Sequence, residues 1–251
     1  DFLGKDSVRW QETVVAEGHD KQFHENLKKI IEKKKPKEEI FEDITSRHVN
    51  QYYSGIVKGL TAKVFRTYLA TTVVKNYLVK YDDIEGRTAN EKLYHAKLAN
   101  LEAAMMCNHK RTIPKTYELT LQKKRDSIKK LEKEQVWKKT QETLKKVKSK
   151  EPKTDIQKKS KTKRIKTLNE QIKKQKAKHK ERLEKLELQL DLSEKTKDYA
   201  IGTSLRNYID PRVFKAWTDE VGAEWEKLYT AALQKKFLWV KNEDVEWKNI
   251  K

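Results

Sequence analysis

One tyrosine stands in a short polar segment that follows a long lysine-rich stretch of the chain. The segment runs from Gly202 to Pro211, and Tyr208 lies just before an Asp-Pro pair that favours a turn. A short polar segment is an unusual place for an aromatic residue of the core. A phenol in this position is suited to reach a phosphate. Taken alone the pattern is weak, because most tyrosines in proteins serve packing.

Three further side chains have types that suit phosphate chemistry. Lys5 lies in a Gly-Lys-Asp sequence, Arg66 lies in an amphipathic helical pattern, and His109 follows Cys-Asn near an expected helix end. Each also has a structural interpretation: a solvated turn lysine, an arginine on the polar face of a helix, and a histidine that interacts with a helix dipole. From spacing alone, the structural interpretation is the stronger one for each.

Metal and nucleotide chemistry find no support in the sequence. The six histidines do not cluster with the single cysteine, Cys107, or with paired carboxylates. No glycine-rich loop of the phosphate-cradling kind is present. We therefore expect no metal site and no cofactor. A single cysteine also excludes an intrachain disulfide and favours a reducing compartment.

The positive charge of the chain is concentrated in one region. The formal net charge is +20, and residues 121–190 hold 26 Lys and Arg against 10 Asp and Glu, which accounts for +16 of it. A positive rod beside a less charged body indicates a polyanionic partner, with nucleic acid the first choice. A solvated helical face explains the charge about equally well. No apolar run approaches the roughly 18 residues of a membrane span, so we expect no membrane partner.

The elements that would position these side chains are mostly helices. Residues 1–15 predict a β-hairpin, and apolar spacing predicts helices over 23–31, after Thr61 and over 90–107. The helix over 90–107 is expected to bury a stripe of large residues: Leu93, Leu98, Leu101 and Met105. Residues 198–251 look compact, and we expect four tryptophans there to pack in a core: Trp217, Trp225, Trp239 and Trp247.

The composition changes between Pro114 and Lys197, where glycine disappears and lysine dominates. In the second half of this stretch, seam residues recur every seven positions, at Ile165, Ile172, His179 and Leu186. A turn around Pro152 separates them from two sparse seams, one of Leu121, Ile128 and Leu131 and another of Trp137, Leu144 and Val147. Two such helices around a reversal predict a long antiparallel helical hairpin. A disordered basic tail is the alternative.

Four motifs carry a resemblance to a known family. They are Asp-Phe-Leu-Gly-Lys-Asp-Ser (1–7), Leu-Thr-Ala-Lys-Val-Phe-Arg-Thr-Tyr (60–68), Cys-Asn-His-Lys-Arg (107–111) and Gly-Thr-Ser-Leu-Arg-Asn-Tyr-Ile-Asp-Pro (202–211). With the basic hairpin between the last two, they closely resemble eukaryotic-type DNA topoisomerase I (type IB), over essentially the whole chain. The resemblance implies a mainly α fold: a helical catalytic domain of the tyrosine recombinase/topoisomerase IB type, with a small N-terminal β-hairpin and a long antiparallel helical-hairpin linker.

The resemblance also implies the organisation of the chain and its partners. Residues 1–112 correspond to the C-terminal part of the catalytic core, 113–197 to a basic, coiled-coil-like linker, and 198–251 to the C-terminal domain. In the family, an N-terminal core and cap part closes over the duplex and supplies a second arginine. We therefore expect double-stranded DNA and this N-terminal part, in the same chain or as a separate subunit, as partners.

The start of the chain and its location carry two further expectations. The chain opens on Asp1 in what reads as a strand and turn, so we expect a fragment or a processed piece. The expected location is the nucleus for a eukaryotic source, and the cytoplasmic nucleoid for an archaeal one.

Individual roles follow from the same resemblance. Tyr208 takes the role of the nucleophile that attacks a DNA phosphodiester and forms a 3′-phosphotyrosyl bond. Arg66 and His109 contact the non-bridging oxygens, and Lys5 is the general acid for the leaving 5′ oxygen. DNA-binding or supporting roles fall to three further residues: Asp6, Thr203 and Asn207. Two local departures from the family pattern, Leu69 and the pair Leu205-Arg206, leave the four catalytic positions intact.

Elementary chemistry is consistent with these roles. A phenol with a pKa of about 10 is a weak nucleophile at neutral pH, so attack needs a positioned phosphate and nearby cations. Arginine suits the phosphate because its planar fork donates two hydrogen bonds. A lysine protonates the leaving oxygen well if neighbouring cations lower its pKa. Because the covalent bond retains the phosphodiester energy, religation needs no ATP.

Two alternative functions remain open. A tyrosine recombinase shares the chemistry, although the long basic hairpin before the tyrosine argues against it. A non-catalytic basic DNA-binding module, built on the lysine-rich arm, would bind DNA without forming a covalent adduct.

Overall fold

The computed structural model describes residues 2–3, 9–11, 13, 15–18, 20–81 and 86–249. Helices dominate these residues, which confirms the expected mainly α class. The short strands β1 (Phe2–Leu3) and β2 (Arg9–Trp10) pair antiparallel, as expected for the small N-terminal hairpin. Lys5 and Asp6, in the sequence between the two strands, lie outside the described residues.

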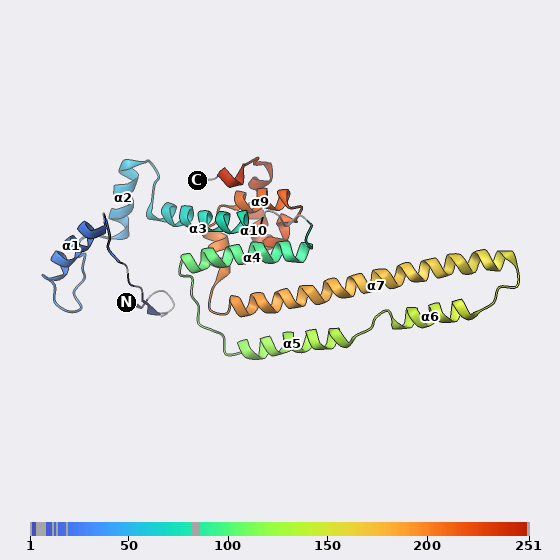
Figure 1. Cartoon of the computed structure of the whole chain (residues 1–251). Coiled ribbons are helices and arrows are strands. Elements are labelled where there is room, and N and C mark those ends of the chain that lie inside the picture. The colour runs from blue at the N-terminus through green and yellow to red at the C-terminus, as the bar shows by residue number, and fades with distance from the viewer. Residues whose placement is uncertain are drawn as a thin grey trace.

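The helices form a body and a long arm (Figure 1). The first four helices are α1 (Asp20–Ile31), α2 (Ser46–Ile56), α3 (Ala62–Val79) and α4 (Ala89–Met106). The arm consists of α5 (Tyr117–Lys133), α6 (Lys138–Ser149) and α7 (Asp155–Lys195). The C-terminal part holds α8 (Ile201–Asn207), α9 (Pro211–Glu220), α10 (Ala231–Lys236) and the 3₁₀ helices η2 (Trp225–Leu228), η3 (Leu238–Asn242) and η4 (Trp247–Asn249).

A hydrophobic core joins α3, α4 and the C-terminal helices. Its α4 members are small, namely Ala96, Ala99 and Ala103. The expected stripe of large residues on α4 is therefore largely wrong: Leu101 is buried, but Leu93 and Leu98 are half-buried and Met105 is exposed. Small side chains at a helix contact allow the two axes to approach closely, so alanines suit the side of α4 that faces α3.

The predicted burial is confirmed for three of the four tryptophans of the C-terminal part. Trp217, Trp225 and Trp247 are buried, whereas Trp239 keeps 49% of its surface exposed. Trp239 lies in η3, where Phe237 and Val240 are the buried neighbours. A 3₁₀ helix has three residues per turn, so positions three apart face the core and the two between them face water.

The arm is an antiparallel helical hairpin rather than a disordered tail. The chain reverses between Ser149 and Asp155, in the stretch that contains Pro152, as the sequence predicts. The outgoing limb is broken between α5 and α6, a feature that the sequence analysis did not foresee. At this break, His179 of α7 places its Nε2 atom 2.8 Å from the carbonyl oxygen of Leu131, and its ring lies edge-on to Trp137.

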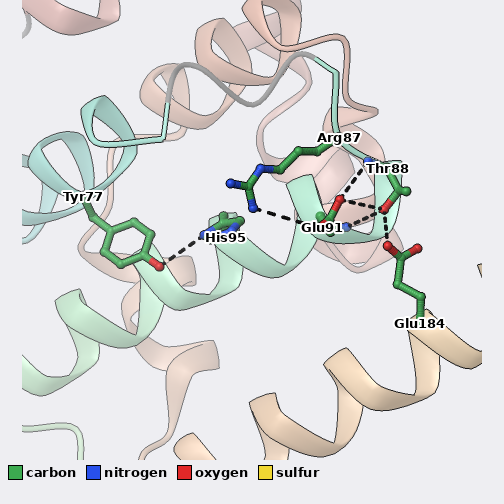
Figure 2. Close-up of polar contacts among 6 residues, drawn as sticks. All are labelled: Tyr77, Arg87, Thr88, Glu91, His95 and Glu184. Atoms are coloured by element: carbon green, nitrogen blue, oxygen red, sulfur yellow. Dashed lines mark hydrogen bonds and ion pairs between the residues drawn. The ribbon is translucent and has the colours of Figure 1, made fainter.

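The base of the arm is bound to α4 (Figure 2). Thr88 caps the N-terminus of α4 in a capping box with Glu91, and its hydroxyl also donates to Glu184 of α7 at 3.1 Å. Two turns further along α7, Tyr94 of α4 donates to Asp191. These polar contacts join the arm to the body. Within the described residues, no helix combines the length and the apolar character that crossing a membrane requires.

Candidate active site

Tyr208 stands at the junction of two helices. It caps the C-terminus of α8, and its backbone N–H donates to the carbonyl oxygen of Ser204 at 2.9 Å. Asp210 then caps the N-terminus of α9 by accepting from the backbone N–H of Arg212 at 3.0 Å, and Pro211 is the first helical residue. The Asp-Pro pair therefore starts a helix directly after the half-buried tyrosine.

His109 is placed by the way α4 ends. Asn108 has a left-handed backbone conformation, with φ of 52°. The backbone N–H of His109 donates to Ala104 at 2.8 Å and that of Asn108 donates to Met105 at 2.9 Å. This pair of bonds is the Schellman motif that closes many helices, and asparagine tolerates the conformation it requires. The Cys-Asn-His sequence is thus a helix stop that directs the chain, and His109 with it, away from the α4 axis.

Three side chains surround the ring of Tyr208, two of them from α3 and one from the segment that follows α4. The ring of His109 lies 5.2 Å away between centroids, at an interplanar angle of 37°. The guanidinium carbon of Arg66, on α3, lies 5.6 Å from the tyrosine ring centroid. The ammonium nitrogen of Lys63, one turn earlier on α3, lies at the same distance. The structure therefore brings Arg66, His109 and Tyr208 together.

Lys63 is a neighbour of Tyr208 that the sequence analysis did not single out. It lies in the quoted motif, three residues before Arg66, and residues three apart share one face of a helix. That spacing is the signal that would have identified it. Both cations lie on an exposed part of α3, so they are accessible to a bound anion.

Buried hydrogen bonds hold the tyrosine segment against the body. Ser204 donates to Oδ1 of Asn100 at 2.8 Å, and Nδ2 of Asn100 donates to the carbonyl oxygen of Ile201 at 2.9 Å. The backbone N–H of Asp210 donates to the hydroxyl of Thr71 at 3.0 Å. The first contacts join α8 to α4 and the last joins the start of α9 to α3. Sequence reasoning missed Asn100 and Thr71, because polar residues inside helical patterns carry no signal of burial.

The backbone around His109 is also bound to the chain that enters α8. The N–H of Ala200 donates to the carbonyl oxygen of His109 at 2.7 Å, and the N–H of Arg111 donates to that of Asp198 at 2.8 Å. Between these two bonds, Lys110 and Tyr199 form an isolated antiparallel bridge. The end of α4 and the start of α8 therefore have a fixed relative position.

The remaining predicted residues divide into two groups. Thr203 and Asn207 lie four residues apart on α8 and line the same pocket. Lys5 and Asp6 fall outside the described residues, so their proximity to Tyr208 stays a prediction.

Cys107 has a structural place beside this site. Its side chain is buried, and burial raises the pKa of its thiol, although the positive charge of Arg66 acts in the opposite direction. A buried neutral thiol is a poor nucleophile. Among the described residues, no group of three or more His, Cys, Asp or Glu side chains is arranged to hold a metal ion.

Comparisons with known proteins match this chain at both ends. A family model described as eukaryotic DNA topoisomerase I, catalytic core, matches residues 1–144, and one described as C-terminal topoisomerase domain matches residues 180–249.

Curated relatives include DNA topoisomerase 1 of Homo sapiens, 35% identical over 98% of this chain and 31% of the relative. DNA topoisomerase I, mitochondrial, of Rattus norvegicus is 33% identical over 97% of this chain and 39% of its own length. DNA topoisomerase 1 of Drosophila melanogaster is 33% identical over 95% of this chain and 22% of its own. The chain thus spans about a third of the length of the human relative. Because the catalytic-core model alone matches more than half of its residues, the chain belongs to the eukaryotic DNA topoisomerase I family.

Proposed function

We propose that this chain is the tyrosine-bearing part of a type IB DNA topoisomerase, an isomerase that relaxes supercoiled DNA without metal or ATP. The observation that carries the proposal is the convergence of Arg66, His109 and Tyr208 from three parts of the chain onto one place. A phenol beside a guanidinium and an imidazole is the arrangement that phosphoryl transfer to tyrosine requires.

In the proposed reaction, the oxygen of Tyr208 attacks a phosphorus of the DNA backbone. The new bond between phosphorus and the phenolic oxygen forms as the bond to the 5′ oxygen breaks, and the phenolic proton passes to solvent. Arg66 and His109 donate hydrogen bonds to the non-bridging oxygens, where negative charge grows. Lys5 gives a proton to the leaving 5′ oxygen, a role that rests on the sequence motif alone. Religation reverses each step, and the free 5′ end swivels in the interval.

The proposal includes double-stranded DNA and an N-terminal core and cap part as partners. The first half of α3 exposes four large apolar side chains, namely Val64, Phe65, Tyr68 and Leu69. Tyr52 and Ile56 extend this surface onto α2, with 70% and 62% of their surfaces exposed. Large apolar side chains exposed in this number on neighbouring helices are typical of a protein contact. We infer that the N-terminal part covers it and supplies the second arginine.

The division of the chain and its location belong to the same proposal. Residues 1–112, 113–197 and 198–251 are proposed as core part, linker and C-terminal domain, and the extent of α5 to α7 supports the linker. The proposed location is the nucleus, which fluorescence of the tagged intact protein would test. The named relatives are animal proteins, so the archaeal alternative finds no support, and the rat relative is named mitochondrial.

Replacement of the nucleophile tests the proposal directly. The intact protein, or this chain together with its N-terminal part, is incubated with supercoiled plasmid in the presence of a chelator and without ATP. We expect Tyr208→Phe to abolish both relaxation and the covalent adduct on a nicked suicide substrate. Tyr117→Phe, on the arm, serves as the matched control and should retain both.

Other outcomes separate the alternatives. Relaxation by Tyr208→Phe would show that another residue is the nucleophile. Salt-sensitive DNA binding without any adduct, in the unsubstituted protein, would support a non-catalytic binding module. Strand exchange between two specific duplexes would support a recombinase.

A further inference from the structure

A pocket of about 670 Å³ opens beside α8, next to the candidate active site. Its polar lining residues come from two stretches of chain that meet at the base of the arm, and they are Arg111, Thr196, Tyr199, Thr203, Arg206 and Asn207. Two of them are arginines, and the described residues that line the pocket include no carboxylate. A pocket with this lining attracts anions.

Arg111 is held in place by the backbone. Its Nε and one terminal nitrogen donate to the carbonyl oxygens of Lys197 and Thr196, each at 3.2 Å. A guanidinium has five N–H donors, so donors remain for an anion after these two bonds form. Because the carbonyls already fix its orientation, little side-chain entropy is lost when an anion binds.

Arg206 provides the second cation. It is exposed, and among the described residues no ion pair to its guanidinium is found. By contrast, the nearby Arg212 forms a bidentate contact with Asp210 that occupies its fork. Lys236 of α10 donates to the backbone carbonyl oxygen of Arg206 at 2.8 Å and brings a further positive charge to this end of α8.

The faces of α8 relate this pocket to the tyrosine. Thr203 and Arg206 are three residues apart and Thr203 and Asn207 are four apart, so the three share one helical face. Asn207 directly precedes Tyr208 in the chain. The pocket and Tyr208 therefore belong to one short stretch of chain, so a DNA strand bound at Tyr208 has a route to the pocket.

We propose that Arg206, with Arg111, binds a DNA backbone phosphate that neighbours the one attacked by Tyr208. This inference rests on the proposed function and adds a second phosphate site to it. The pocket is open and much larger than one phosphate group, which suits a strand that passes through better than a free anion that is enclosed.

The test measures non-covalent DNA affinity in the intact Tyr208→Phe protein, where no adduct can form. We expect Arg206→Ala to weaken binding about tenfold, as for loss of one charge-assisted hydrogen bond. The slope of log affinity against log salt should fall by about one. Arg206→Lys should restore part of the affinity, because a point charge remains while the fork is lost. Thermal unfolding of each variant verifies that it is folded.

Neutralised phosphates identify the site. A methylphosphonate replaces each phosphate in turn on either side of the cleavage position. The loss caused by Arg206→Ala should disappear when one particular neighbour of the scissile phosphate is neutral, because the two changes then remove the same contact. Arg164→Ala, which removes an exposed charge on α7, serves as the control and should show no such coupling.

Several results would overturn the inference. An unchanged affinity in Arg206→Ala, or an equal loss on every modified duplex, would exclude a defined phosphate contact. Pyrophosphate that binds in an Arg206-dependent manner, while DNA affinity stays unchanged, would indicate a site for a free anion. These measurements report DNA binding and not strand cleavage, so a failure of this inference is distinguishable from a failure of the proposed function.

Discussion

The hydroxyl of Ser204 donates a hydrogen bond of 2.8 Å to Oδ1 of Asn100, across 104 positions of the sequence. Ser204 is fully buried, and Asn100 is 3% exposed. Removing either partner of such a buried hydrogen bond destabilises the folded protein, because the other partner is left unsatisfied. The two side chains are therefore held in a defined geometry. The pair holds α8 along α4 and thereby determines where Tyr208 leaves the helix.

Ser204→Ala should destabilise the protein by about 1–3 kcal/mol, because it leaves a buried acceptor on Asn100 without its donor. The free energy of unfolding measured in denaturant verifies this. Ser149→Ala, which removes an exposed hydroxyl at the end of α6, should stay within about 0.5 kcal/mol of the unsubstituted protein. Equal effects of the two substitutions would contradict the structural role of the pair.

The conformation of Asn108 gives a second prediction. Asn108→Val should destabilise by about 1–3 kcal/mol, because a β-branched residue is strained at a φ of 52°. Asn108→Gly adopts this conformation freely and should remain close to the unsubstituted stability. Single-turnover adduct formation should fall in the valine variant only, since His109 follows directly. Similar stability of both variants would argue against the left-handed helix stop.

A buried and an exposed tryptophan of the C-terminal part should contribute differently to the free energy of unfolding. Trp217 is fully buried in the core, and Trp217→Ala should cost about 3–5 kcal/mol of unfolding free energy. Trp239→Ala removes a half-exposed ring of η3, so most of that cost should be absent. Thermal unfolding of the paired variants provides the measurement. A larger loss in Trp239→Ala would place that side chain in the core after all.

The stability of the α3–α4 pair should depend on pH through His95. Burial lowers the pKa of this imidazole below 6.5, and the positive charges of Arg87 and Lys195 lower it further, whereas Glu91 raises it. The ring stacks on Tyr81 and lies 3.4 Å from the hydroxyl of Tyr77, as Figure 2 shows for Tyr77.

The unfolded chain therefore binds a proton at His95 more readily than the folded chain does. The contribution of His95 to stability is complete above pH 6.5 and is lost as the pH falls through the lower, folded pKa. One group changes the stability by at most about 1.4 kcal/mol per pH unit. Denaturant unfolding between pH 7 and pH 5 measures the slope, and His95→Phe should reduce it. An unchanged slope would assign the dependence to other groups.

Much of the helical framework could be predicted from local patterns. The helix over 90–107 and the reversal at Pro152 depend on periodicity and on a residue that cannot continue a helix, both of which are local. The buried face of α4 and the exposure of Trp239 could not be predicted, because they depend on which helix or 3₁₀ turn packs alongside. The break between α5 and α6 has no glycine or proline to mark it, and it is occupied by a histidine from the opposite limb.

The candidate site also has features that follow from local sequence and features that depend on packing. The sequence by itself determined the four motifs, their order, the basic hairpin between the last two and the membership of the family, because residue types and spacing are sufficient for these. The tertiary structure alone decided that Arg66, His109 and Tyr208 meet, that Lys63 joins them, and that Asn100 and Thr71 hold the segment in place. The reason is physical: these contacts join helices that are distant in sequence, and only the packing of α3, α4 and α8 around a shared core brings them within reach of one another.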